Sequence, residues 1–213
     1  MALDTALTTT AAVKIYLNID STNTNRDIAI AALVTRYSSA VSVFCNRTFL
    51  QADLTQYHSG DGTPDIWVDN YPITSPVTGS YGLWLDSNRA FGSSSILDED
   101  VAGTGGGDYI LIRGGGEEGC GRIRRKYGTW PIGDENIKTT LQCGYASGSI
   151  PNPVVEAVHM WIGKAFQVSE MRAHATTTTS TVGGGGSISF VEHKMPEDIQ
   201  AMLIPWRRPS RRG

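Results

Sequence analysis

The stretch NPVVEAVHMWIGKAFQVSEMRAH, residues 152–174, decides the fold. Asn152 is a helix-capping residue type, Pro153 suits the first helical position, and Glu156 lies near the positive end of the helix dipole. Apolar side chains recur every three or four positions, at Val154, Val158, Trp161, Ile162, Ala165, Phe166 and Met171. The stretch therefore predicts a long helix whose apolar face is wide enough to contact more than one neighbour.

Two further helices are predicted near the N-terminus. Thr8, Thr9 and Thr10 can cap a short helix that ends near Asn18. Thr24 and Asp27 then stand at capping-box spacing before a second helix. Its apolar residues, again at helical spacing, are Ile30, Leu33, Val34, Tyr37, Val41 and Phe44. We expect these two helices to form a hairpin that shares one core with residues 152–174.

From about Phe49 to Ser147 the apolar period shifts to two, and Gly, Pro, Asn and Asp separate the apolar runs. Strands are predicted at residues 54–58, 65–69, 83–86, 109–113, 121–125 and 137–144. The turn at residues 60–63, Gly-Asp-Gly-Thr, predicts that the first two strands form a β-hairpin. The expected fold class is α+β, a helical core (N-terminal helical hairpin plus long C-terminal helix) with an inserted small antiparallel β region.

Five segments follow from these patterns. Residues 1–48 form the N-terminal helices of the core, 49–150 the inserted β region, 151–175 the long core helix, 176–190 a Thr/Gly loop and short strand, and 191–213 a C-terminal helix and tail. The polar run Thr176 to Ser187 cannot bury enough surface to offset chain entropy, so we expect it to be flexible. Pro196 opens the last helix and Pro205 ends it.

The distribution of charge singles out the C-terminus. The chain of 213 residues has a formal net charge of -3, and the four arginines of the tail leave -7 on the remainder. An acidic body with a cationic tip favours docking onto an anionic partner. Trp206 precedes these arginines and is a typical interface anchor. The candidate docking residues are Trp206, Arg207, Arg208, Arg211 and Arg212.

A search for catalytic, cofactor or metal sites finds little. Residues 114–119, GGGEEG, match a dinucleotide fingerprint by spacing, but two glutamates would face the pyrophosphate. The four histidines are scattered, and Cys45, Cys120 and Cys143 have no metal-ligand spacing. No G-x-S-x-G motif is present. We therefore expect no enzyme activity, no cofactor and no metal.

Two other features concern location and partners. Arg122, Arg124 and Lys126 alternate, which places them on one face of a strand, usually a solvated or inter-subunit edge and only sometimes a phosphate track. Residues 1–10 lack a basic run followed by an apolar core, and no run of about eighteen apolar residues occurs. We expect a chain made in the cytoplasm and not embedded in a membrane.

The order of short motifs resembles the tailed-bacteriophage head-tail connector family described as gp6-like adaptors. The matching residues are Val13-Lys14, Tyr16 to Asp20, Asp27 to Leu33, Phe44 to Phe49, Tyr57, Gly60 to Thr63, Asn70 to Ile73, Asn136 to Lys138, Gly144-Tyr145, Ile150-Pro151 and Leu203 to Arg208. The glycine-rich loops between Gly103 and Gly121 and the Thr/Gly linker depart from the family pattern. Each motif alone is weak, and their common order carries the resemblance.

The resemblance implies a structural subunit of the virion neck. Such subunits form a homo-oligomeric ring, twelve-fold, beneath the portal protein, where they extend the DNA channel, help retain the genome and offer a site for a stopper or tail-completion protein. DNA would pass through the lumen without sequence-specific binding. Our hypothesis is that the arginine tail docks on the portal, with Trp206 as its apolar anchor. The alternative is a DNA-binding or packaging-associated module that uses the basic tail on phosphates.

Overall fold

The computed structural model describes residues 6–74, 82–100, 106–113, 121–175 and 194–208. The chain divides into two compact units. The first, here called the helical unit, comprises residues 1–44 and 151–204, and the second, the β unit, comprises residues 45–150 and 205–213. The glycine-rich sequence 114–119 and the predicted loop and strand at 176–191 lie outside the described residues.

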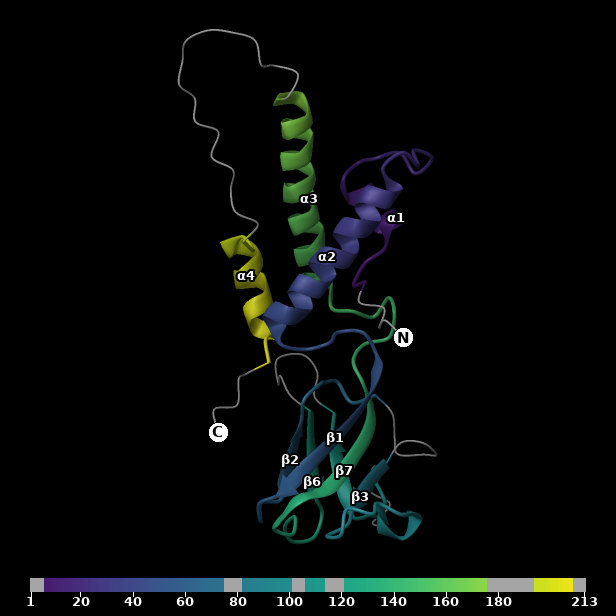
Figure 1. Ribbon diagram of the computed structural model, residues 1–213, viewed down its shortest axis with the longest axis vertical. Coiled ribbons are helices and arrows are strands. Elements are labelled where there is room, and N and C mark those ends of the chain that lie inside the picture. Colours follow the sequence, from purple (N-terminus) through teal and green to yellow (C-terminus); the bar gives the residue numbers. More distant parts are fainter. Residues whose placement is uncertain (1–5, 75–81, 101–105, 114–120, 176–193, 209–213) are drawn as a thin grey trace. The chain divides into compact units, whose positions relative to one another are not determined.

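Four α-helices are described, and Figure 1 labels them α1 (Thr10–Tyr16), α2 (Asp27–Cys45), α3 (Asn152–Ala175) and α4 (Glu197–Leu203). The threonine cap of the first helix is confirmed, because the Thr9 hydroxyl accepts a hydrogen bond from the Ala12 N–H at 3.1 Å. The last helix begins after Pro196, as predicted. Its α-helical part ends at Leu203, before Pro205, and a 3₁₀ turn, Ile204–Trp206, follows.

The helical unit is built around α3, against which α1 and α4 both pack. The Tyr37 ring of α2 contacts the Trp161 ring of α3 with centroids 4.6 Å apart. The predicted helical periodicity is confirmed in burial. The buried apolar residues of α2, α3 and α4 are Ile30, Val34, Tyr37, Val41, Cys45, Val154, Ala157, Val158, Trp161, Ile162, Ile199 and Leu203.

The β unit contains two antiparallel sheets (Figure 1). One has the strand order β1-β7-β3-β4, with β1 Ala52–Gly60, β7 Gly133–Cys143, β3 Gly82–Leu85 and β4 Ile96–Leu97. The other has the order β2-β6-β5, with β2 Asp65–Val68, β6 Gly121–Arg125 and β5 Tyr109–Ile112. A 3₁₀ turn, Ser93–Ser95, precedes β4. With four helices and two antiparallel sheets described, the fold class is α+β.

One buried cluster draws its residues from both sheets. It comprises Ile66, Val68, Ile73, Leu83, Tyr109, Leu111, Ile123, Trp130, Ile137, Leu141 and Cys143. Along β7 the odd-numbered residues from Ile137 to Cys143 are buried and the even-numbered ones between them are partly exposed. This alternation is the period of two that the sequence predicts for half-buried strands.

The predicted hairpin between residues 54–58 and 65–69 is wrong. β1 pairs with β7, and β2 pairs with β6 in the other sheet. The turn between them is a corner instead: the Asp61 carboxylate accepts hydrogen bonds from the N–H and hydroxyl of Thr63, at 2.9 and 2.6 Å. The Trp130 N–H then donates to the Thr63 carbonyl at 2.9 Å. These bonds fix the turn, and β1 pairs with the longer strand β7 and not with β2.

Among the described helices, α2 is long and apolar enough to cross a bilayer, with a mean hydropathy of 1.6 over the window. This property differs from the expectation that no segment would resemble a membrane span. By itself it is weak support for one, because the core helix of a soluble protein passes the same test. Only 33% of the window is buried inside the subunit, which leaves an apolar helix face exposed.

Candidate functional site

The candidate docking residues begin where α4 tightens into the 3₁₀ turn. Trp206 is partly buried, Arg207 is exposed and Arg208 is partly buried. Arg211 and Arg212 lie outside the described residues. Residues 206–208 belong to the β unit.

Arg208 is held by its own subunit through two contacts. Its backbone N–H donates a 2.9 Å hydrogen bond to the carbonyl of Cys45, and its guanidinium pairs with the Asp69 carboxylate. The Asp69 N–H in turn donates to the Gln56 side-chain oxygen at 3.1 Å, which connects the end of β2 to β1. Arg208 therefore differs from a free tail cation, because its charge is already compensated.

Cys45 lies at the centre of this region without being reactive. Burial raises the pKa of its thiol to about 11, while the positive charges of Arg47 and Arg207 act in the opposite direction. A thiol with so high a pKa carries almost no thiolate at neutral pH.

Arg47 is a second buried cation, and its role was not predicted from the sequence. Only 6% of its surface is exposed. Its guanidinium carbon lies 3.5 Å from the centroid of the Tyr71 ring, 4.7 Å from Phe49 and 5.7 Å from Tyr145. The Nη2 group donates to the Tyr71 carbonyl. Three aromatic faces thus compensate a charge that no described carboxylate neutralises.

Arg122 and Arg124 lie on one face of β6, as their alternation predicts. Both reach Asp65 on the neighbouring strand β2: Arg124 at 2.8 Å and Arg122 at 3.4 Å. The hydrogen bond from Arg124 is the main cause of a lowered Asp65 pKa. Lys126 pairs with Asp100 at 2.6 Å. The three cations therefore face carboxylates of their own chain, which weakens the case for a phosphate track.

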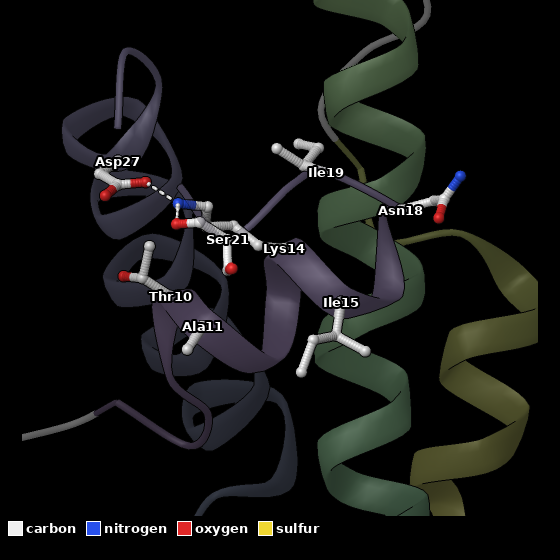
Figure 2. Close-up of a pocket in the computed structure, with 8 residues that line it drawn as sticks. All are labelled: Thr10, Ala11, Lys14, Ile15, Asn18, Ile19, Ser21 and Asp27. Atoms are coloured by element: carbon white, nitrogen blue, oxygen red, sulfur yellow. Dashed lines mark hydrogen bonds and ion pairs between the residues drawn. The ribbon is translucent and has the colours of Figure 1, made fainter. Parts of the chain in front are cut away.

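A pocket of about 610 Å³ lies between α1, the following turn and the start of α2 (Figure 2). The buried Lys14 ammonium points to the Asp27 carboxylate, at 2.8 Å, and to the Ser21 carbonyl, at 2.9 Å. Because both contacts are within the chain, this lysine ties α1 to α2 and offers little to a bound anion. The described residues also contain no group of three or more His, Cys, Asp or Glu side chains that could hold a metal ion.

Comparison with known proteins supplies structural neighbours only. No protein-family model matches the chain, and no curated protein sequence matches it. A chain from the virion of a native gene transfer agent particle has a TM-score of 0.59 at 12% identity. Chains from the neck of the empty particle, computed with C6 symmetry, and of the native particle, computed with C12 symmetry, have TM-scores of 0.56 and 0.55 at 14% and 13% identity.

In each of these three cases the alignment covers 100% of this chain and 95% of the neighbour. The likeness therefore extends over both units and is not limited to one common motif. At these identities it shows that the fold is shared with chains of gene transfer agent particles, two of them from the particle's neck.

Proposed function

We propose that this chain is a structural head-tail connector (adaptor) subunit of a tailed phage or phage-like particle. Copies form a ring under the portal that extends the DNA channel and provides the attachment site for a stopper or tail-completion protein. The helical unit forms the ring core, with the N-terminal helices as a hairpin beside α3. The role is structural and non-enzymatic, and its place is the virion neck.

The observation that carries this proposal is the full-length likeness to chains of a particle neck. Neck structures computed with six-fold and twelve-fold symmetry support a ring of identical copies. They are also compatible with the twelve-fold ring that the sequence resemblance implies. The order of motifs along the chain and the shared fold are independent indications of the same assembly.

The tail geometry divides the proposed docking residues into two groups. Arg208 fixes the base of the tail through Cys45 and Asp69, whereas Arg207 is exposed. We infer that Arg207, Arg211 and Arg212 provide the charge that meets portal carboxylates or carbonyls, with Trp206 as the apolar anchor. A fixed base lowers the entropy cost of docking, because Arg208 is already positioned before the portal binds.

The charge balance favours a connector over a DNA-binding module. The net charge is -3, and Arg122, Arg124 and Lys126 already pair with Asp65 and Asp100. A protein whose affinity for DNA comes from phosphate contacts needs several uncompensated cations. An acidic subunit instead lets DNA move past without adhering.

Deletion of residues 205–213 tests the docking role. We expect the truncated chain to remain folded, by circular dichroism, and to fail to join portal-containing heads. A second variant separates charge from chain length: it replaces Arg207, Arg211 and Arg212 by Gln and keeps Trp206 and Arg208. It should also fail, because the docking charges are gone although the tail base remains.

Normal head joining by both variants would contradict portal docking through the tail. Binding of the isolated wild-type chain to duplex DNA, with an affinity that falls steeply as salt is raised, would instead support the DNA-binding alternative.

A further inference from the structure

The exposed face of α2 carries apolar side chains, as a helix surface does when a partner covers it. Ile28 is 90% exposed and Val43 is 79% exposed on a helix that is apolar on its buried side as well. Ile28, Ala32 and Arg36 form a row of exposed residues four positions apart, here called the α2 row. A helix that is apolar on all sides is normally buried by a partner.

The α2 row carries one charge, that of Arg36. Its guanidinium lies over the ring of the adjacent Tyr37, and no described carboxylate pairs with it. The only other charged residue of α2 is Asp27, which pairs with Lys14. A partner for this face would therefore be apolar, with one negative charge.

A surface with one negative charge and one apolar side chain, Met160, exists on α3 of the same chain. Glu156 and Gln167 are exposed and Met160 is partly buried, and these three residues, here called the α3 stripe, share one side of the helix. Neighbouring helices flank this side of α3 and cover part of it. Trp161 contacts Tyr37 of α2 and Lys164 pairs with Asp198 of α4, whereas Gly163, on the same side as the α3 stripe, is buried against Tyr16 of α1.

Glu156 is the uncompensated charge of the α3 stripe. It forms no ion pair with a described residue, whereas the nearby Lys164 is neutralised by Asp198 at 2.6 Å. The α2 row and the α3 stripe are thus two helix surfaces that each carry a single charge, and the two charges are opposite in sign.

We propose that the α2 row of one copy packs antiparallel on the α3 stripe of the next copy, with Arg36 paired to Glu156. This inference rests on the proposed ring and names its interface. Steps of four residues advance about 6 Å along each helix, so pairing Arg36 with Glu156 brings Ala32 opposite Met160. The small Ala32 side chain leaves room for the longer Met160.

The antiparallel direction follows from exposure. The row is exposed from Arg36 back to Ile28, whereas the next member in the other direction, Ala40, is partly buried. Only the antiparallel arrangement therefore aligns the α3 stripe with the exposed part of α2. Because the two contacting surfaces differ, the contact is head-to-tail, and such contacts make a ring when the rotation between copies closes.

Cysteine cross-linking between two chains tests the contact. A chain carrying Ala32→Cys is mixed with a size-tagged chain carrying Met160→Cys, and the mixture is oxidised. We expect the mixed dimer and neither homodimer, since Ala32 of one copy meets Met160 of the next. The wild-type chain gives the background from native thiols, of which Cys45 and Cys143 are buried.

Charge reversal then tests the ion pair within the same assay. Arg36→Glu on the first chain, or Glu156→Arg on the second, should lower the yield of mixed dimer about ten-fold, because like charges meet. Both reversals together should restore the yield to within about three-fold of the starting pair. All four substituted positions are exposed or partly exposed, so folding should be unaffected, which thermal unfolding checks.

No mixed dimer above background, equal amounts of homodimers, or no rescue by the double reversal would overturn the proposed contact. So would binding of the wild-type chain to phosphatidylglycerol vesicles through α2, lost on Ile28→Glu, since a bilayer would then cover this face. If neck rings form in particles while the cross-link fails, the interface is wrong and the ring itself stands.

Discussion

Arg47 is a buried cation that holds three aromatic rings together, a role that the residues next to it in the sequence do not predict. It follows the end of α2, and its guanidinium is enclosed by Phe49, Tyr71 and Tyr145. Its Nε and Nη1 atoms have no hydrogen-bond partner among the described residues. Aromatic faces and one carbonyl therefore provide the compensation for its burial.

Substitution of Arg47 should separate packing from charge. Arg47→Ala leaves a cavity among three rings and an unpaired carbonyl, and we expect a loss of about 3–4 kcal/mol in the free energy of unfolding. Arg47→Met keeps most of the volume and should lose about 1–2 kcal/mol, the contribution of the cation–π contacts and hydrogen bond. Urea unfolding measures both. A Met variant as stable as the wild type would show that the guanidinium contributes no net stability.

His159 should make the helical unit sensitive to mild acid. Burial lowers its pKa, against an opposing effect of Glu156, and its Nε2 lies 2.7 Å from the Thr8 hydroxyl. Because the folded pKa is below the unfolded value of about 6.5, the unfolded state binds more protons as the pH falls. The associated stability is present above about pH 6.5 and is lost as the pH falls through the folded pKa.

The matched variant is His159→Gln, which can still hydrogen-bond to Thr8 but does not titrate. Urea midpoints measured between pH 5 and 8 should fall on the acid side for the wild type and change less for the variant. Identical pH profiles for the two proteins would exclude His159 as the source of the acid sensitivity.

At the scale of elements, the corner after β1 replaces the hairpin that the sequence predicts. A Cβ atom at Gly60 would lie 1.9 Å from the Pro131 carbonyl oxygen, and Gly62 has a φ of 79°. The Gly60 N–H also donates to the Asn136 side chain at 2.9 Å. These close approaches direct the chain from one sheet to the other.

Gly60→Ala should therefore destabilise the β unit by more than about 3 kcal/mol, since the clash is with backbone and cannot be relieved by a rotamer change. Gly92→Ala is the matched control, because no atom lies within 4 Å of its added Cβ. It should change stability by less than about 1 kcal/mol. Chemical denaturation followed by tryptophan fluorescence measures the free energy of unfolding of both variants. Equal values would contradict a close backbone contact at Gly60.

The elements were predictable from the sequence where their determinants are local. Helical spacing of apolar residues located α2 and α3, and a period of two located β5, β6 and β7 near their observed bounds. Strand partners were not predictable in the same way. A Gly-Asp-Gly-Thr turn is compatible with both a hairpin and a corner, and the choice depends on β7, more than sixty residues later.

The candidate site shows the same limit. The arginine tail is visible in the sequence as a charge run, but the pairing of Arg208 with Asp69 joins residues 139 positions apart. An isolated carboxylate next to a strand end gives no sequence signal of a distant arginine.

At the scale of the whole molecule, three features agree with the proposed ring. They are the likeness to particle neck chains, the acidic composition and the fixed base of the tail. Stability of a ring would come from many repeated contacts, each modest in strength. We therefore expect assembly to depend on concentration or on a portal template and to be sensitive to single changes at the subunit contact.

Electron cryomicroscopy of intact particles that carry this chain, with a small tag inserted after residue 213, tests the central claim most directly. The account predicts a closed ring of identical copies at the neck, directly beneath the portal, with the tag density at the portal-facing side. Particles whose necks lack this chain, or tag density found on the capsid shell or the tail tube, would contradict it.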